Sequence, residues 1–271
     1  MWPNFLQRSQ FSAYLSAKHV AISSNKNNIL KNSDNVIISP NSTATEIWQQ
    51  SCARLESLLE ANKNKSNTPI TISVGSDLVR FLMLPPQQVT MNRQEKIAYA
   101  TAAFQEIYGA NASDWEIKHH DNAPNQPRIV AAIDKNLITR VSQIAVKNHL
   151  KLNSLQPYVM TAFNQSTQYF SGADTYLAIL EMNRLTLIFI KSGYYQQLRS
   201  HVINDDWPAD FKKILLRESA TSETACRDIL VYSSKHEAES LTIEGWTIKS
   251  MGQLKPSPLL GANHSNLKVA I

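Results

Sequence analysis

The chain has 271 residues, of which 43% are hydrophobic, so it can bury a substantial core and is typical of one to two folded domains. Its longest apolar stretch, residues 185–190, is far shorter than the roughly 20 residues that cross a bilayer. The N-terminus has no basic start followed by an apolar run, which argues against a cleaved secretory signal. We therefore expect a cytoplasmic protein.

The formal net charge of +5 permits an acidic partner, nucleic acid or an anionic membrane surface. Lys and Arg are scattered, however, and no run of four or more basic residues occurs. The charge therefore identifies no partner. The two cysteines, Cys52 and Cys226, lie far apart without a Cys-x-x-Cys spacing, so we expect free thiols rather than a disulfide or a metal site.

The first part of the chain is predicted to form three strands. One covers residues 14–22 and is followed by a polar turn at 23–28, and shorter strands are expected at 29–30 and 36–38. Thr43 and Glu46 have the spacing of a capping box, in which each side chain binds a free backbone N–H of the first helical turn. The apolar positions of the helix that follows are Trp48, Cys52, Leu55 and Leu59.

The next block reads as a small α+β module at about residues 77–133. A strand at 70–74 precedes it, and a second strand at 78–84 is stopped by two prolines. A helix then begins after Asn92, with Glu95 completing a second capping box and Gly109 ending the helix. Strands at 115–119 and 128–133 complete the module.

The remaining elements alternate regularly. Asp134 is expected to cap a helix, and Pro157 to lie in the first turn of another. The other predicted elements are strands at 152–155, 175–181, 185–191, 194–203, 228–233 and 246–249, a helix from residue 207 and a short helix at 235–241.

These elements contain one order twice, β-β-β-α-β-α-β, once over residues 12–170 and more clearly over 175–250. Two stacked copies predict an α/β fold of the actin-like type, with duplicated ribonuclease-H-like halves and an inserted α+β subdomain in the first half. The expected division is a first half at 1–170 that contains the insertion at 77–133, a second half at 171–252, and an extended tail at 253–271.

An actin-like ATPase binds phosphates in the turn between the first two strands of each half, where glycine lets the backbone approach and an acidic residue helps to place magnesium. The corresponding turns are predicted at residues 23–28 and 182–184, and neither contains glycine. Glu181 is the one acidic residue at such a position, which makes it the residual nucleotide-site candidate. We therefore expect no catalytic residue, no metal site and no ATP or magnesium cofactor.

Nucleic-acid chemistry has little support. A nuclease on this fold needs several carboxylates around two metal ions, and the predicted strand at 14–22 has none. The tryptophans lie on separate elements without interleaved basic clusters, which favours packing over base stacking.

Four segments resemble the actin-like assembly proteins of type IV pilus and type II secretion inner-membrane platforms, the PilM-like group and relatives such as the mannose-sensitive pilus biogenesis protein. They are SDLVRFLMLP at 76–85, EKIAYA at 95–100 with Phe104 and Tyr108-Gly109, ASDW at 112–115, and LNSLQP at 152–157. The similarity covers about residues 45–235 and lies in the order of the segments rather than in an invariant signature.

The resemblance implies an actin-like fold with an inserted subdomain, near which the cytoplasmic tail of a single-span inner-membrane partner docks as an extended peptide. The strand at 78–84 and the neighbouring strand at 128–133 are the candidate docking segments, since a strand offers main-chain hydrogen bonds and alternate side chains. The candidate partner-binding residues are Leu78, Arg80, Leu82, Leu84, Arg128 and Val130. An equally weighted alternative is that these residues form the module's core, with Arg80 in solvent.

The leading hypothesis is a non-catalytic actin-like scaffold, a pseudo-ATPase at the inner face of the bacterial inner membrane that touches the membrane only through its partner. A homodimer is compatible with this role. The alternative is a divergent actin-like ATPase or sugar-kinase-like enzyme with rebuilt phosphate loops. A third class, nucleic-acid binding, is disfavoured by the scattered charge.

Overall fold

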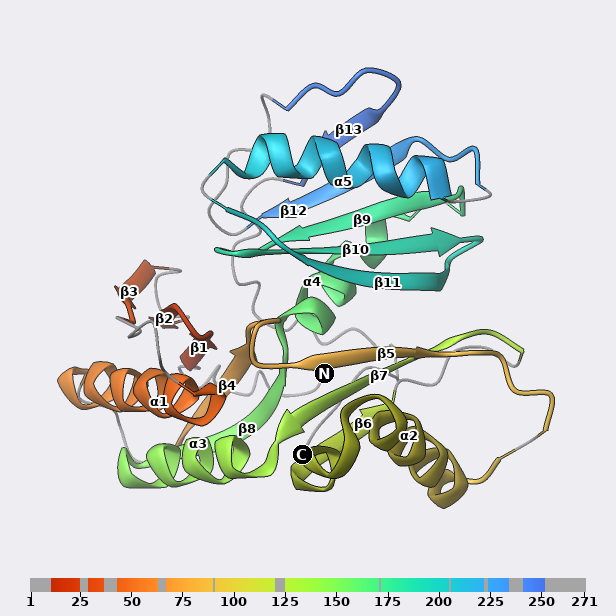
Figure 1. Cartoon of the computed structure of the whole chain (residues 1–271). Helices are drawn as coiled ribbons and strands as arrows, with labels where there is room; N and C mark the ends of the chain where they lie inside the picture. The colour runs from red at the N-terminus through yellow and green to blue at the C-terminus, as the bar shows by residue number, and fades with distance from the viewer. Residues whose placement is uncertain are drawn as a thin grey trace, which may run out of the picture.

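The computed structural model in Figure 1 contains two lobes and a smaller inserted module. It describes residues 11–24, 29–36, 43–62, 67–89, 91–119, 125–170, 172–204, 206–221, 224–233 and 241–251. The helix predicted at 235–241 lies almost wholly outside the described residues. The tail at 253–271 and residues 25–28 lie wholly outside them.

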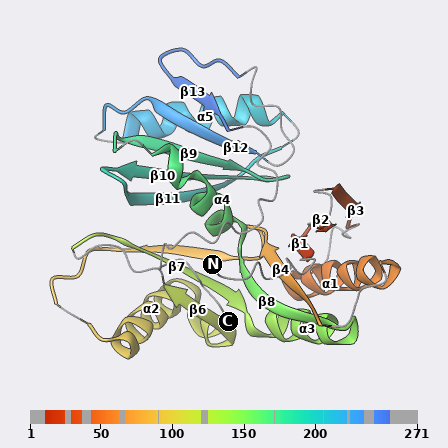
Figure 2. The same ribbon diagram turned by 180° about the vertical axis from the view of Figure 1, so that it is seen from behind.

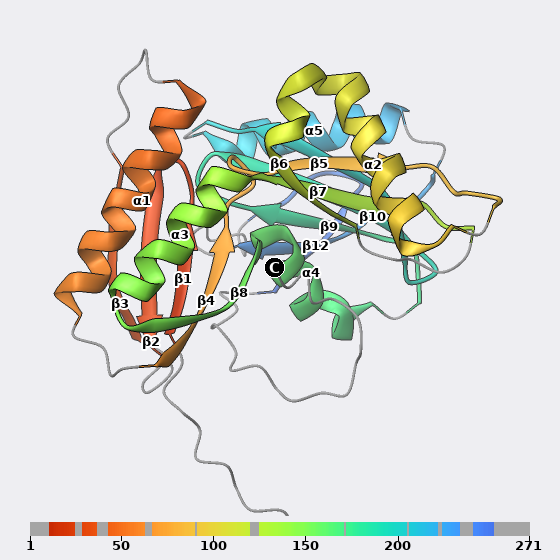
Figure 3. The ribbon, with the colours of Figure 1, turned by 90° about the horizontal axis from the view of Figure 1, so that it is seen from below.

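The first lobe is built on a five-stranded sheet in the order β3-β2-β1-β4-β8. Its strands are β1 (Phe11–Leu15), β2 (His19–Ser24), β3 (Ile29–Asn35), β4 (Thr68–Val74) and β8 (Leu150–Pro157). The first three pair antiparallel, whereas β4 runs parallel to both β1 and β8. Two helices, α1 (Ala44–Ala61) and α3 (Lys135–Lys147), lie side by side against this sheet (Figure 3).

The second lobe repeats the same arrangement with the order β11-β10-β9-β12-β13. Its strands are β9 (Thr175–Leu180), β10 (Arg184–Lys191), β11 (Tyr194–Val202), β12 (Asp228–Ser233) and β13 (Thr247–Ser250). Here too the first three strands are antiparallel, and β12 runs parallel to β9 and β13. The strand order and directions therefore match those of the first lobe, which confirms the duplicated α/β architecture.

Helices cover both faces of the second sheet. Helix α5 (Trp207–Thr221) packs on one face, and α4 (Tyr158–Ser166) packs on the other, between the two lobes (Figures 1 and 2). A short 3₁₀ turn, η2 (Thr167–Tyr169), follows α4. Because both faces are covered, every residue of β9 is buried, which explains why this strand is an unbroken apolar run rather than an alternating one.

The inserted module lies between β4 and α3 in the chain. It consists of β5 (Arg80–Leu84), α2 (Arg93–Tyr108), the 3₁₀ helix η1 (Gly109–Asp114), β6 (Trp115–His119) and β7 (Arg128–Asp134). The strands pair in the order β5-β7-β6, all antiparallel. Helix α2 covers one face of this sheet and buries Phe104 against it.

The capping predictions are confirmed. Thr43 caps α1 and Asn92 caps α2, each in a complete capping box with the glutamate three residues later. Gly109 ends α2 with a φ of 66°, in the region that glycine adopts without steric cost. Cys52 is fully buried on the inner side of α1, Cys226 is half-buried, and both are free thiols.

Several boundaries differ from the predictions. Strand β3 extends to Asn35 instead of ending at residue 30, Val36 lies outside any strand, and the rest of the strand predicted at 36–38 lies outside the described residues. The strand predicted at 14–22 is in fact two strands, β1 and β2, joined by a tight turn at residues 16–18. The Ser16 hydroxyl stabilises this turn, because it donates to the His19 carbonyl oxygen and accepts from the His19 N–H. The alternation of apolar and polar residues along the sequence cannot reveal a turn so short. Pro157 caps α4 instead of lying in its first turn. Among the described residues, no helix is long and apolar enough to cross a membrane.

Candidate functional site

The crevice between the lobes is the candidate site, because the carboxyl ends of parallel strands in open α/β sheets are where ligands usually bind. The turn of the first lobe that faces it is the β1–β2 turn at residues 16–18, and the sequence prediction of residues 23–28 for this turn was wrong. Ser23 and Ser24 of the predicted segment belong instead to β2, and its remaining residues lie outside the described part of the chain. The correct turn also lacks glycine.

Backbone N–H groups of this turn already have partners inside the chain. The N–H of Ser16 donates to the carbonyl oxygen of His19 at 2.9 Å, and the N–H of Ala17 donates to Oδ2 of Asp77 at 3.0 Å. The N–H of His19 donates to Oγ of Ser16 at 3.0 Å. A phosphate would have to displace these acceptors, and the displaced Asp77 carboxylate would then lie beside it.

The turn of the second lobe, after β9, is also internally bonded. The N–H of Glu181 donates to the carbonyl of Arg184 at 2.8 Å, which closes the turn, and the N–H of Ile203 donates to the carbonyl of Asn183 at 3.0 Å.

Glu181, the residual nucleotide-site candidate, reaches across the crevice to the first lobe. Its side chain is almost wholly buried, with 3% of the residue exposed. Its Oε1 accepts a hydrogen bond from the Tyr14 hydroxyl at 2.9 Å and another from the Ser76 N–H at 3.0 Å. These donors lie 167 and 105 residues away in the chain, so one carboxyl joins the two lobes.

The electrostatics of the crevice favour neutral side chains. The pKa of Glu181 is raised to about 7, mainly by burial and also by the nearby Asp77, and hydrogen bonds from Ser76 and Tyr14 limit this rise. Burial also raises the pKa of Asp77, opposed by the Ala17 N–H and by the charge of Arg184. The pKa of Tyr14 lies well above its usual value, because the phenol is buried beside these two carboxyls.

Gly75 lets the first-lobe side of the crevice pack closely, where the turn after β4 meets β1. A Cβ at this position would lie 2.6 Å from Cβ of Ser16 and 2.9 Å from both the Tyr14 hydroxyl oxygen and Oδ1 of Asp77. No real Cβ tolerates such distances, so the crevice is packed to the point where only glycine fits. We call Tyr14, Gly75, Ser76, Asp77 and Glu181 the crevice cluster.

The crevice cluster provides two carboxyls, and within the described residues no group of three or more His, Cys, Asp or Glu side chains could hold a metal ion. A divalent cation here would also need both carboxyls ionised at once, whereas burial raises the pKa of each. The arrangement forms a direct hydrogen-bonded contact between the lobes.

The six candidate partner-binding residues lie on more than one surface. Leu84 and Val130 are buried in the module's core beneath α2, and Leu82 packs half-buried against the same core. Leu78 packs against the core of the first lobe. Arg128 and Arg80 are half-buried, and the guanidinium of Arg80 lies 3.4 Å from two backbone carbonyl oxygens just before it in the chain.

The outer edge of β5 faces the second lobe. Strand β5 is terminal in its sheet, as β11 is in the second lobe, and the two strands lie close together without pairing (Figure 1). Phe81 and Met83 of β5 pack against the core that contains α4 and the second sheet. A peptide adding to this edge of β5 would therefore need the second lobe to move away.

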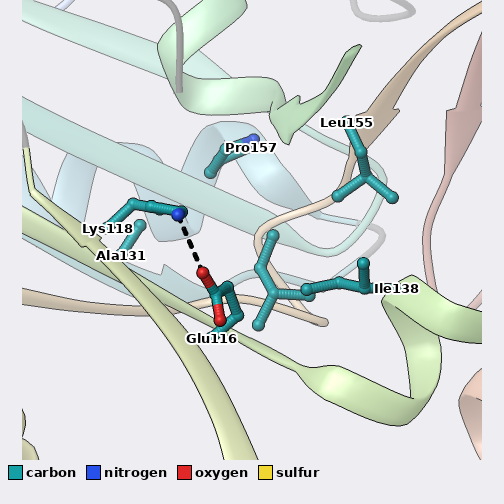
Figure 4. Close-up of a pocket in the computed structure, with 7 residues that line it drawn as sticks. Glu116, Lys118, Ala131, Ile138, Leu155 and Pro157 are labelled. Carbon is teal, nitrogen blue, oxygen red and sulfur yellow. Dashed lines mark ion pairs between the residues drawn. The ribbon is translucent and has the colours of Figure 1, made fainter. Parts of the chain in front are cut away.

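A shallow groove lies elsewhere on the module, where it meets the first lobe (Figure 4). Its interior has room for no more than a water-sized group, and its mouth is open to solvent. Glu116 and Lys118 on β6 form an ion pair of 2.8 Å on its wall. The other lining residues are Ala131, Ile133, Ile138, Leu155 and Pro157.

Sequence reasoning missed four of the five crevice residues. Ser76 and Asp77 belong to the segment on which the family resemblance rests, but no role was assigned to them there. The available signal was the Gly75-Ser76-Asp77 sequence directly after a buried parallel strand, since such strand ends converge on the crevice. Tyr14 carries no comparable signal, because a tyrosine in a strand is ordinary core.

Comparison with known proteins yields structural similarity alone, because no protein-family model and no curated protein sequence matches the chain. One similar solved structure is the PilM-PilN type IV pilus biogenesis complex, with a TM-score of 0.58, 9% identity, and coverage of 89% of this chain and 87% of that one. Another is the cytoplasmic domain of EpsL, an inner-membrane component of the type II secretion system of Vibrio cholerae, with a TM-score of 0.55, 9% identity and 90% coverage of each chain.

A protein of Bacteroides thetaiotaomicron, described as having an actin-like ATPase fold and unknown function, is also similar, with a TM-score of 0.55, 14% identity, and coverage of 86% and 84%. At these identities the similarity shows the fold. The fold of this chain is actin-like, and the resemblance to actin-like pilus and secretion assembly proteins is supported by two of these neighbours.

Proposed function

We propose that this protein is a non-catalytic actin-like scaffold that binds the cytoplasmic tail of an inner-membrane partner in a type IV pilus or type II secretion platform. The observation that carries the proposal is the crevice cluster, in which Asp77 and Glu181 accept the backbone N–H groups of Ala17 and Ser76. The protein's own carboxyls thus occupy positions that phosphate oxygens would need.

The nature of the partner rests on the structural neighbours. One of them is a PilM-PilN complex and another is the cytoplasmic domain of an inner-membrane secretion component. By analogy, this chain works in the cytoplasm at the inner face of the membrane and is held there by a single-span partner.

We place the docking site at the inserted module, where two positions can be distinguished. The groove beside Lys118 is open in the closed molecule, whereas the edge of β5 beside Arg80 becomes available only if the second lobe moves. The groove is the better candidate because it is open to solvent in the closed molecule, so an extended peptide can lie across its mouth with Glu116 and Lys118 available to charged residues of the peptide.

Peptide titration tests the scaffold role. The probes are synthetic peptides of the cytoplasmic tails of any single-span membrane proteins encoded beside this gene. We expect binding that Lys118→Glu weakens at least tenfold while Arg80→Glu, the matched charge reversal, changes it little. The reverse ranking of the two variants would place the site at β5, and no binding of any tail peptide would contradict the partner role.

Calorimetric titration with Mg-ATP tests the non-catalytic part. We expect no heat of binding and no shift in melting temperature at 5 mM nucleotide. A site with a Kd of about 5 μM would add about 4 kcal/mol of stability at that concentration, which is easily measured. Micromolar binding, or steady magnesium-dependent turnover, would favour the divergent ATPase or sugar-kinase-like alternative.

A further inference from the structure

Two hydrogen bonds between the lobes at the crevice meet at one carboxyl oxygen. Oε1 of Glu181, from the second lobe, accepts both the Tyr14 hydroxyl and the Ser76 N–H, which come from separate segments of the first lobe. A neutral carboxyl can accept both hydrogen bonds, because Oε1 is then the carbonyl oxygen and the proton resides on Oε2. The neutral form therefore keeps the contact without burying a charge.

The ionised form is in a poorer environment while the lobes are closed. Among the described residues, the charged and titratable groups that face Glu181 are Tyr14 of β1 and Asp77 of the turn after β4. The charge of Arg184 on β10 acts on Asp77, and Tyr158 of α4 packs edge-on against the Tyr14 ring. Asp77 repels a second negative charge, and the surrounding packing excludes water. Separation of the lobes lets water reach the carboxylate and removes this penalty.

We propose that the Glu181 contact is proton-linked, so that the neutral carboxyl holds the crevice closed and ionisation of the carboxyl favours its opening. The inference concerns contacts within this chain and stands whether or not the scaffold role is correct.

A separate contact, between the inserted module and the second lobe, is uncharged and serves as an internal reference. Gln196 of β11 donates to the side-chain oxygen of Gln126 at 2.7 Å, and the apolar Phe81 and Met83 pack nearby against the second lobe. We therefore expect opening to be local to the crevice, with the β5–β11 contact unchanged between pH 6 and pH 8.

The size of the effect follows from the two ionisation states. The pKa of Glu181 is about 7 in the closed crevice and takes its ordinary value of 4.5 when the side chain is solvated. Because the pKa differs between the closed and open states, the equilibrium constant for opening the crevice rises about tenfold from pH 6 to pH 8.

Hydrogen exchange of the full chain, read by mass spectrometry, tests the proposal. The native protein is compared with Glu181→Gln at each pH, so that the intrinsic chemistry of exchange cancels. In peptides covering residues 14–18 and 74–78, the ratio of native to variant exchange should rise about tenfold from pH 6 to pH 8. An equal ratio at both pH values would overturn the proposal.

Glu218→Gln is the matched control. Glu218 is also a buried glutamate, 2% exposed, but both its oxygens accept Nη1 of Arg199 within the second lobe, at 3.0 Å each. In this variant, hydrogen exchange in the crevice peptides should depend on pH as it does in the native protein. Loss of that dependence in Glu218→Gln would mean that global destabilisation, not the crevice contact, is being measured.

Two further measurements keep the test decisive if Glu181→Gln folds poorly. In the native chain alone, exchange corrected for intrinsic rates should rise in the crevice peptides and not in the peptides of β5 and β11. Tyr14→Phe, which removes one donor and keeps the carboxyl, should speed crevice exchange at both pH values. A uniform rise across the protein, or no effect of Tyr14→Phe, would count against the proposal.

Discussion

Gly75 is the residue whose lack of a side chain lets the turn after β4 pack closely against β1 and Ser16 within the first lobe. A methyl group there overlaps Cβ of Ser16, which is fixed to the backbone and cannot rotate away. We expect Gly75→Ala to lower the free energy of unfolding by about 1–3 kcal/mol, the usual cost of overpacking. Urea denaturation measures this cost.

A second substitution separates overpacking from other effects of Gly75→Ala. Tyr14→Phe removes the hydroxyl oxygen that would lie 2.9 Å from the new methyl group but leaves the Ser16 overlap. In the Gly75→Ala background, Tyr14→Phe should lower the free energy of unfolding by less than it does in the native background. Full additivity of the two substitutions would show that the methyl group does not press on Tyr14.

Glu181 should also make global stability depend on pH. Its pKa is about 7 in the folded protein and 4.5 when solvated. Its contribution to the free energy of unfolding is therefore fully present below pH 4.5 and is lost as the pH rises through 7. Relative to Glu181→Gln, the native protein should lose up to about 3 kcal/mol of unfolding free energy across this window. Denaturation at several pH values measures the difference, and parallel curves for the two proteins would contradict it.

At the scale of elements, the best predicted features were those that local chemistry determines. The two capping boxes, at Thr43 and Asn92, required only residues three positions apart. The module's strands were also predicted close to their observed ends, because prolines and polar loops bound them. The β1–β2 hairpin was missed, since its turn is formed by the Ser16 side chain and not by glycine or asparagine.

The cap of α1 provides a test at this scale. Thr43 accepts the Glu46 N–H at 3.3 Å and donates to the Glu46 carboxylate, and its own N–H binds that carboxylate at 2.6 Å. Thr43→Ala should cost about 0.5–2 kcal/mol of unfolding free energy. Thr43→Ser, which keeps the hydroxyl, should cost much less in the same denaturation assay, and equal losses would refute the capping role.

At the scale of the whole molecule, Phe81 links the parts. Its ring packs against the core of the first lobe and also against the core that contains α4 and the second sheet. Phe81→Ala should therefore lower stability by about 2–4 kcal/mol and reduce the cooperativity between lobes. In calorimetry, we expect the unfolding transition to broaden or divide.

Phe104→Ala is the comparison for this variant. Phe104 is wholly buried, but only within the module's core beneath α2. It should cost at least as much stability while leaving the cooperativity between the lobes intact. If both variants broaden the transition equally, Phe81 has no special role between the lobes.

The sequence by itself determined the duplicated order of elements, the inserted module and the helix caps, because each depends on periodicity or on residues near one another in the chain. Only the tertiary structure decided which turn faces the crevice and what fills it. Glu181 and its donors lie 105 and 167 residues apart, and nothing in a local pattern brings such residues together. The same reason applies to Leu84 and Val130, whose burial depends on where α2 packs.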